Sequence, residues 1–365
     1  MKHPYANLPD YAYWRRSVVG RERLDPMVDP PFRIHPETAA ATAGSCFAQH
    51  IGRRLQAAEC HFLQTEPPHP LLGEYAAQRL NYGVYSARYG NIYTPRQLVQ
   101  LFERAYERLQ PRQDAWGDAQ GRIVDPFRPH IQPGGFNSAR ELRIDRERHF
   151  AAVREMFEKL DVFIFTLGLT EAWRARADGV VFPLCPGVAG GEFDEAEHEF
   201  VNFGVEDIVA DMRLFFNKLR SVNRRARLIL SVSPVPLAAT AEPRHVAVST
   251  MASKSILRVA CDVLSRDADI AYFPAYEIIA GGYVGQDYFA PDRRSVSKQG
   301  VDCVMEVFFA HFLERRSLGQ RTLDKAATLL SRRQPPSSQK IDEVSVALEA
   351  MCDEAALDLE PSAGS

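Results

Sequence analysis

The 365-residue chain is longer than an average domain and shorter than three, so one enlarged domain with appendages is expected. Its 45% hydrophobic and 25% charged residues are typical of a chain that builds a large core without help from metals or disulfides. A formal net charge of -3 and the lack of a long basic run argue against a nucleic-acid partner.

The cysteines and the apolar segments restrict the cofactors and the compartment. The six cysteines are scattered, without a C-x-x-C pair or a histidine at zinc-ligand spacing, so we expect thiols and no metal or other cofactor. Residues 1–23 lack the apolar stretch of a signal peptide, and no run of eighteen apolar residues predicts a membrane span. We therefore expect a cytoplasmic protein.

Short apolar runs alternate with helical patterns along the chain. Buried strands are predicted at residues 39–43, 162–167, 228–232 and 270–273. Helices are predicted at residues 47–57, 95–109, 145–160, 205–222, 249–265 and 298–314, and the fourth has the clearest three-and-four spacing. A strand followed by a helix, repeated along the chain, predicts an α/β fold, a three-layer α/β/α sandwich around a mostly parallel sheet.

The chain divides into three predicted parts. An N-terminal segment (residues 1–29) precedes the α/β domain (30–316), and a tail (317–365) follows it. Within the domain, the long irregular stretches 66–94 and 111–138 are rich in Pro, Gly, Tyr and Arg. Loops of this length in a compact domain are usually functional, so we expect them to build walls around a site.

The tail has a composition of its own. Residues 335–338 read Pro-Pro-Ser-Ser and predict a linker, after which an amphipathic helix is expected. From residue 341 to the end there are seven acidic residues and no basic ones. This segment is either a solvated acidic tail or one that docks onto the body or a partner protein.

The segment Thr42-Ala43-Gly44-Ser45-Cys46-Phe47 joins the first predicted strand to the first predicted helix. In an open parallel sheet, ligands bind at this edge, and a glycine lets the backbone turn sharply and approach a substrate. The N–H groups at a helix start stabilise negative charge, so Cys46 is a candidate nucleophile, and Ser45 another if a base reaches it. Small residues at such a turn also serve close packing, so the motif alone does not decide.

The stretch Gly44-Ser45-Cys46-Phe47-Ala48 matches the signature of the GSCFA-domain family, which resembles the SGNH/GDSL hydrolase superfamily. Further blocks similar to that family lie at residues 89–93 (YGNIY), 125–129 (DPFRP), 166–171 (TLGLTE), 231–236 (SVSPVP) and 272–277 (YFPAYE). The chain is identified as a member of the GSCFA family over roughly residues 30–316. The resemblance implies an SGNH-like or flavodoxin-like sandwich.

The resemblance also implies roles for residues near the turn. SGNH enzymes open with Gly-Asp-Ser, whose serine attacks an ester; the overlay puts Cys46 at the nucleophile position and Ser45 at the aspartate position, and Ser45 stays open as the alternative nucleophile. The pair Gly90-Asn91 is similar to the block that supplies an oxyanion-hole amide. The block Gly168-Leu169-Thr170-Glu171 resembles Gly-x-Asn-Asp and puts Thr170, which can donate only through its hydroxyl, where the side-chain donor stands.

The general base departs from the superfamily pattern. SGNH enzymes end with Asp-x-x-His before the last helix, whereas this chain has Asp292-Arg293-Arg294-Ser295, and serine cannot replace imidazole as a base near neutral pH. The leading substitute is His245, on the loop after the third predicted strand, and the second is His50, one turn into the first helix. Asp292 is expected to orient the base or to cap the final helix, and Glu171 to form an ion pair or act in acid/base chemistry.

Two functions follow from these residues. The first is an acyl-ester hydrolase or O-acyltransferase that forms an acyl-enzyme at the turn. The resemblance implies an acylated carbohydrate or small ester as its substrate. The alternative is a catalytically inactive SGNH-like module that binds a glycan, an anionic ligand or a partner protein.

Overall fold

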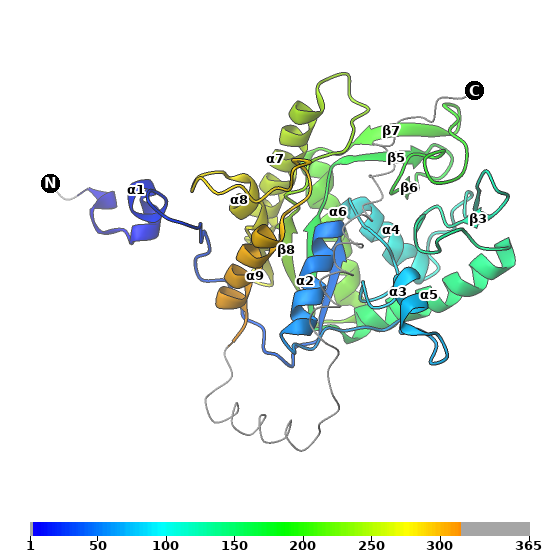
Figure 1. Cartoon of the computed structure of the whole chain (residues 1–365), viewed down its shortest axis with the longest axis horizontal. Helices are drawn as coiled ribbons and strands as arrows, with labels where there is room; N and C mark the ends of the chain where they lie inside the picture. The colour runs from blue at the N-terminus through cyan, green and yellow to red at the C-terminus, as the bar shows by residue number, and fades with distance from the viewer. Residues whose placement is uncertain (1–2, 315–365) are drawn as a thin grey trace, which may run out of the picture.

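A four-stranded parallel sheet forms the centre of the protein, whose computed structural model describes residues 3–314. Its strands are β1 (Ala40–Gly44), β4 (Val162–Leu167), β8 (Arg227–Val232) and β9 (Ile270–Phe273). They lie in the order β1-β4-β8-β9, and each neighbouring pair is parallel (Figure 1). The four predicted strands and their parallel arrangement are confirmed.

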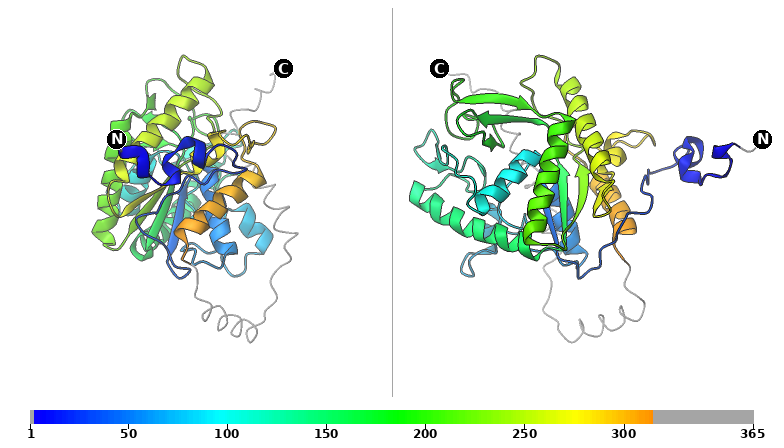
Figure 2. Two further views of the ribbon diagram at one scale, coloured as in Figure 1. Left: turned by 90° about the vertical axis from the view of Figure 1, so that its left-hand side faces the viewer. Right: turned by 180° about the vertical axis from the view of Figure 1, so that it is seen from behind.

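Helices cover both faces of this sheet. On one face lie α4 (Pro95–Ala105), α5 (Ala139–Lys159), α6 (Val205–Val222) and α7 (Val246–Leu264). On the other face lie α2 (Cys46–Ala57), α8 (Ala275–Ala280) and α9 (Lys298–Phe312), with α2 and α9 side by side (Figures 1 and 2). The predicted three-layer α/β/α sandwich is therefore confirmed.

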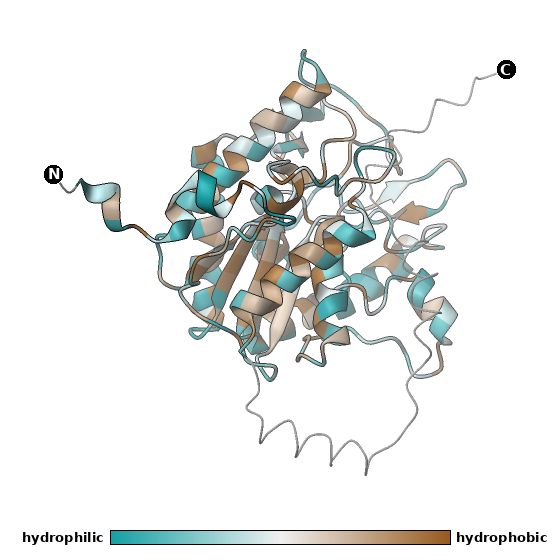
Figure 3. Cartoon of the chain, turned by 60° about the vertical axis from the view of Figure 1, so that its left-hand side comes forward, coloured by the Kyte–Doolittle hydropathy of each residue, from teal (hydrophilic) through white to brown (hydrophobic). Residues whose placement is uncertain are grey.

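The strands are buried on both faces because two hydrophobic cores meet at the sheet. Phe163 and Phe165 of β4 pack in the core under α4 to α7, while Ile164 between them packs in the core under α2, α8 and α9. The strands are correspondingly hydrophobic in Figure 3, as expected for a sheet covered on both sides. Full burial of one such side chain contributes about 1.5–3 kcal/mol to folding.

Three helices depart from a predicted bound by three residues or more. Helix α5 begins at Ala139 rather than 145 because the Ser138 side chain caps it, accepting from the Glu141 N–H at 3.2 Å. Helix α4 ends at Ala105 rather than 109, and the chain then passes through Glu107 at a positive φ of 59°. Helix α7 begins at Val246 rather than 249 because His245 caps it.

The sequence reasoning missed a second, antiparallel sheet. It comprises β5 (Glu171–Ala175), β6 (Val181–Phe182) and β7 (His198–Asn202), in the order β6-β5-β7, and lies between β4 and α6 in the chain. The predicted irregular stretches contain short elements as well. These are α3 (Glu74–Arg79), β2 (Trp116–Gly117) and β3 (Ile123–Val124). Strands of two to five residues are too short to show a reliable alternation of apolar and polar residues.

The two ends of the domain are adjacent. The Ile34 N–H donates to the Phe312 carbonyl at 2.7 Å, which ties the start of the domain to the end of α9. The short helices η1 (Pro4–Asn7), η2 (Asp10–Ala12) and α1 (Trp14–Ser17) project away from the sandwich (Figure 1). Among residues 3–314, each helix falls short of the length or the apolar character that a membrane crossing needs. The predicted linker and tail helix lie outside the described residues.

Replacing Gly44 with alanine should destabilise the protein by about 3 kcal/mol or more, through backbone strain and a steric clash. Gly44 has a φ of +141°, and a Cβ built on it would lie 2.3 Å from the Thr166 carbonyl oxygen. Urea unfolding measures the change. Gly20→Ala is the control, because Gly20 also has a positive φ (+74°) but a Cβ added there would meet nothing within 4 Å. Equal losses for both variants would show that the close approach to Thr166 is unimportant.

Candidate active site

The turn that follows β1 is fixed by its neighbours on both sides. Gly44 is the register partner of Thr166 on β4, and its carbonyl accepts from the Ile92 N–H at 2.9 Å. Ser45 then takes an extended conformation as the N-cap residue, and Cys46 is the first residue of the twelve-residue helix α2. The turn therefore places Cys46 directly at a helix N-terminus on the carboxyl edge of the sheet, where negative charge is stabilised.

Cys46 and Ser45 differ in how accessible they are. Cys46 is partly exposed, whereas Ser45 is 4% exposed. The Ser45 hydroxyl is buried and has no hydrogen-bond partner among the described residues, and it does not cap the helix. A nucleophile has to be reached by its substrate, so the geometry favours Cys46 over Ser45.

Two further buried hydroxyls without a hydrogen-bond partner in the described chain lie at the same edge. They belong to Thr166 and Ser231, which are register partners on β4 and β8. Because side chains alternate along a strand, they lie on the same face as Ile164 and Ile229, which belong to the core that includes α2. The Ser45 hydroxyl is a third such group, and Ser45 follows directly after the last residue of the adjacent strand β1. Such unsatisfied groups are rare and call for an explanation.

The predicted pair Gly90-Asn91 lies beside the start of α2. Asn91 Oδ1 accepts hydrogen bonds from Gln49 Nε2 at 3.1 Å and from the Tyr85 hydroxyl at 3.3 Å. Gln49 follows Cys46 by three residues and so lies on the same side of α2. Gly90 has a positive φ of 71°, which a glycine adopts without strain. The structure thus brings the first two blocks of the motif together.

The block that begins at Gly168 joins the same cluster of turns, but its hydroxyl is engaged elsewhere. The Gly168 N–H donates to the Tyr93 carbonyl at 2.9 Å, and the Thr170 N–H donates to Ser253 Oγ at 3.0 Å. The Thr170 hydroxyl donates to Asn202 Oδ1 at 2.7 Å. The Thr170 hydroxyl therefore already donates its proton to Asn202, so an oxyanion at this site would need a different side-chain donor.

The leading histidine candidate for the general base, His245, acts as a helix cap. His245 is exposed and is the N-cap residue of α7, where its Nδ1 accepts from the Ala247 N–H at 3.1 Å. His50 is the second candidate, on α2 one turn after Cys46. Burial, and then the charges of Arg53 and Arg54, lower the pKa of His50 to about 4, so its imidazole is neutral but weakly basic at pH 7.

Asp292 forms a turn with the serine that stands in the histidine position. Its carboxylate accepts from the Arg294 and Ser295 N–H groups at 3.0 and 2.9 Å, and from the Ser295 hydroxyl at 2.6 Å. Ser297, not Asp292, caps the final helix α9, so the capping alternative is wrong. The hydrogen bonds of Asp292 to Ser295 lower its pKa although desolvation acts against them.

Glu171 has a hydroxyl partner. It begins β5, is 9% exposed, and accepts from the Thr240 hydroxyl at 2.8 Å. Burial raises the pKa of Glu171, and the hydrogen bond from Thr240 only partly offsets this shift. A carboxyl with a raised pKa can take part in proton transfer, so the acid/base alternative for Glu171 stays open.

Comparison with known families agrees with this arrangement. The model of the GSCFA family matches residues 39–308, well over half of the chain and all four strands of the central sheet. The chain belongs to the GSCFA family. No curated protein is similar enough to match it. Within residues 3–314, no three His, Cys, Asp or Glu side chains are grouped so that they could hold a metal ion.

Sequence reasoning missed a buried lysine near the GSCFA turn. Lys254 of α7 is 1% exposed, and its Nζ donates to the Gly168 carbonyl at 2.6 Å. A signal for it was available, because Lys254 precedes the buried residues Leu257 and Cys261 by three and seven positions. This spacing puts the lysine on the side of its helix that faces the core, where charged residues are uncommon.

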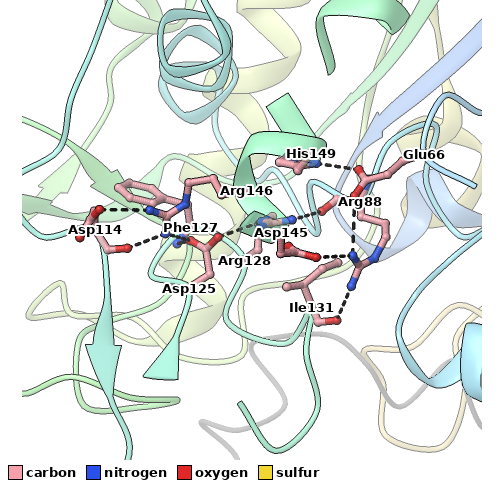
Figure 4. A network of polar contacts seen from close by, with 10 residues as sticks. All are labelled: Glu66, Arg88, Asp114, Asp125, Phe127, Arg128, Ile131, Asp145, Arg146 and His149. Carbon is pink, nitrogen blue, oxygen red and sulfur yellow. Dashed lines mark hydrogen bonds and ion pairs between the residues drawn. The ribbon is translucent and has the colours of Figure 1, made fainter. Parts of the chain in front are cut away.

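Sequence reasoning also missed a network of charged side chains, most of them buried (Figure 4). Its members are Glu66, Arg88, Asp114, Asp125, Arg128, Asp145, Arg146 and His149. Arg128 bonds Asp125 at 2.9 Å and Asp145 at 2.8 Å, and its Cα would lie 3.9 Å from a Cβ on Gly90. The network therefore fixes the backbone beside Asn91 from behind, using both irregular stretches and α5.

The Glu66–His149 pair anchors one end of this network. Glu66 Oε2 lies 2.8 Å from His149 Nδ1 and also accepts from the Arg88 N–H at 2.7 Å. Burial alone would raise the pKa of Glu66. The interactions with His149, Arg128 and the Arg88 N–H outweigh burial, so the pKa of Glu66 lies below its usual range. Burial and the Arg128 charge lower the pKa of His149, so its imidazole stays neutral at pH 7.

Replacing Glu66 with glutamine should cost about 3–5 kcal/mol at pH 7, because it removes one partner of a buried charged network. Urea unfolding checks this. The control is Glu155→Gln, which breaks an exposed pair with Lys159 (2.7 Å) and should cost less than about 1 kcal/mol.

The pH dependence gives a second readout for the same variant. The pKa of Glu66 is lower in the folded protein than in the unfolded chain, where it is near 4.5, so its carboxylate stabilises the fold above that pH. This stabilisation is lost as the pH falls toward the pKa of Glu66 in the folded protein. The wild type should therefore lose more stability between pH 5 and pH 3 than Glu66→Gln does. An identical loss in both would contradict the assigned role of Glu66.

Proposed function

We propose that this GSCFA protein is an acyl-ester hydrolase or O-acyltransferase whose nucleophile is the Cys46 thiol. One observation carries the proposal. A partly exposed cysteine is the first residue of α2, two residues after a glycine whose position leaves no room for a Cβ, at the carboxyl edge of a parallel sheet. This is the edge where open α/β sheets bind ligands, and the N–H groups of a helix N-terminus there stabilise the negative charge of a tetrahedral oxyanion.

The chemistry would run through a thioester. Cys46 Sγ transfers its proton to water and attacks the acyl carbonyl, which forms a C–S bond and a tetrahedral oxyanion. The N–H groups at the start of α2 and at Gly90-Asn91 are the nearby donors for that oxyanion. Collapse breaks the bond to the leaving alcohol, which takes up a proton, and water or a hydroxyl acceptor then releases the acyl group from sulfur.

The substrate class rests on the resemblance to SGNH enzymes. It supports an acylated carbohydrate or small ester, with water as the acceptor in a hydrolase and a sugar hydroxyl in a transferase. A cytoplasmic location is also proposed, and it is supported by all five cysteines in the described part of the chain, which are thiols rather than disulfides.

A second function is favoured by a different observation. The Asp292 carboxylate is saturated by hydrogen bonds from its own turn, and Ser295 stands where the superfamily has its base. A protein that has lost its base in this way would be a binding module for a glycan, an anionic ligand or a partner protein. The acidic tail, proposed as a docking segment, lies outside the described residues.

Covalent labelling separates the two functions. An activated ester such as p-nitrophenyl acetate, with mass spectrometry of the trapped acyl-enzyme, should label the wild type at Cys46, and Cys46→Ala should abolish the label. Cys60→Ala is the matched control. Cys60 is also a partly exposed thiol and lies just after the end of α2, so its replacement should leave the label intact. Label that disappears only in Ser45→Ala would move the nucleophile to Ser45.

A binding module would behave differently in the same assay. Labelling would be slow, and equal in the wild type and in all three single-residue variants. That outcome would reject acyl transfer and favour the second function.

A further inference from the structure

We propose that the N-terminal arm (residues 4–17) binds a negatively charged lipid surface, a function separate from the proposed acyl transfer. The arm consists of η1, η2 and α1, and none of the residues in these three helices is buried. It projects from the side of the sandwich that carries α8 and α9 (Figures 1 and 2). The arm contributes no side chain to the two hydrophobic cores at the sheet.

The arm exposes large apolar side chains. Tyr5 is 67% exposed, Tyr11 and Trp14 are each 60% exposed, and Val19, just after α1, is 61% exposed. On the body of the protein Tyr283 is 54% exposed, and its ring meets that of Trp14 edge-on, with 5.0 Å between the ring centroids. Single exposed apolar residues are ordinary at a protein surface, but a group of them marks an interaction site.

The arm has a defined structure although it is not buried. The Tyr13 hydroxyl donates to the Tyr5 carbonyl, and Ser17 Oγ donates to the Tyr13 carbonyl at 2.9 Å. Arg16 pairs with Asp10 at 3.2 Å. These contacts hold the three short helices together, so the arm presents its aromatic rings to the outside in a defined arrangement.

The residue types fit a lipid interface. Tryptophan and tyrosine gather at membrane–water interfaces, where the ring is in apolar surroundings and the polar end reaches water. Arg15 and Arg16 follow Trp14 directly and are exposed. The same residue types are also enriched at protein–protein interfaces, so the charge of the neighbouring chain has to decide between the two.

The chain next to the arm is basic. The Ile34 N–H donates to the Phe312 carbonyl at 2.7 Å, and the Glu314 N–H donates to the Ile34 carbonyl at 2.9 Å. The end of the described domain therefore lies beside the segment that leads from the arm into β1. Residues 315–340, which follow this end, include seven basic residues and one acidic residue, and the acidic segment 341–365 comes only after them.

An aromatic arm and a basic stretch thus start from the same place on the domain. This combination holds peripheral proteins on anionic lipids, because the rings enter the headgroup region while the cations pair with the phosphates. Helices η1, η2 and α1 have four, three and four residues, whereas a membrane-spanning helix needs about 20. The arm is therefore suited to lie in the lipid surface.

The test mixes the full chain with vesicles of phosphatidylcholine, either alone or with about 30% phosphatidylglycerol, and measures the protein that sediments with them. The wild type should bind the anionic vesicles, and should bind the neutral ones about tenfold more weakly or less. High salt should release it from the anionic vesicles, because salt screens the attraction.

Aromatic variants locate the contact. Tyr11→Ala and Trp14→Ala should each weaken binding about tenfold, because each removes a large side chain that would enter the lipid. Tyr75→Ala is the matched control and should bind as the wild type does. Tyr75 is 75% exposed and lies on α3, and the Arg79 guanidinium lies over its ring at 6.0 Å, as that of Arg16 lies over the Tyr13 ring in the arm.

A pair of arginine variants tests the charge. Arg15→Gln should weaken binding to the anionic vesicles about fivefold and leave binding to the neutral ones unchanged. Arg148→Gln is the control, because Arg148 is exposed on α5, which lies on the opposite side of the molecule from α1 (Figures 1 and 2). It should leave both unchanged. Circular dichroism checks that the variants fold.

Tryptophan fluorescence tests the contact directly. The chain has three tryptophans, and Trp116 is 5% exposed while Trp173 is partly buried, so a blue shift on adding anionic vesicles should come from Trp14. Trp14→Phe should keep vesicle binding and lose the blue shift. A shift that persists in Trp14→Phe would place another tryptophan at the lipid and overturn the inference.

Three further results would overturn it. The first is a wild type that does not sediment with anionic vesicles. The second is an equal loss of binding in Tyr75→Ala, which would move the contact away from the arm. The third is a dimer in analytical ultracentrifugation that Trp14→Ala makes monomeric, without vesicle binding, because the arm would then contact a second copy of the chain. Labelling of Cys46 is independent of all three, so acyl transfer is tested separately.

Discussion

The close approach of β1 to β4 at their carboxyl ends governs the candidate site. At Gly44 the backbone passes so near to the Thr166 carbonyl that an added Cβ would lie 2.3 Å from it. The same register puts Ser45 and Cys46 over the end of the sheet and starts α2 there. A side chain at position 44 would push the strands apart and move the thiol away from the turns that surround it.

Those surrounding turns are held by buried polar contacts rather than by the sheet. The segment that carries Gly90-Asn91 has no strand of its own, and the charged network around Arg128 supports it from behind. Buried ion pairs contribute little net stability against an apolar core, but losing one partner is costly. This gives the network a positioning role, because it allows one arrangement of the loop beside α2 and penalises others.

The polar groups at the candidate site differ from those that the resemblance to SGNH enzymes implies. Where the resemblance implies an imidazole, the chain has Ser295, whose hydroxyl donates to Asp292. The Thr170 hydroxyl, which the resemblance implies as an oxyanion donor, donates to Asn202. Meanwhile the sheet edge keeps three buried hydroxyls without partners among the described residues, and a lysine bonded to the Gly168 carbonyl. The proposed acyl transfer therefore needs polar groups from other elements than those that the resemblance to SGNH enzymes implies.

The sequence by itself determined the parallel sheet, its helices and the turn at Gly44-Ser45-Cys46. Strand and helix periodicity is a local property, which is why 162–167 and 270–273 were predicted to the residue. The partners of Lys254 and Glu66 were decided only by tertiary structure. Lys254 lies 86 residues from Gly168, and Glu66 lies 83 residues from His149. Contacts over such separations depend on how whole elements pack together, and no local pattern in the chain encodes them.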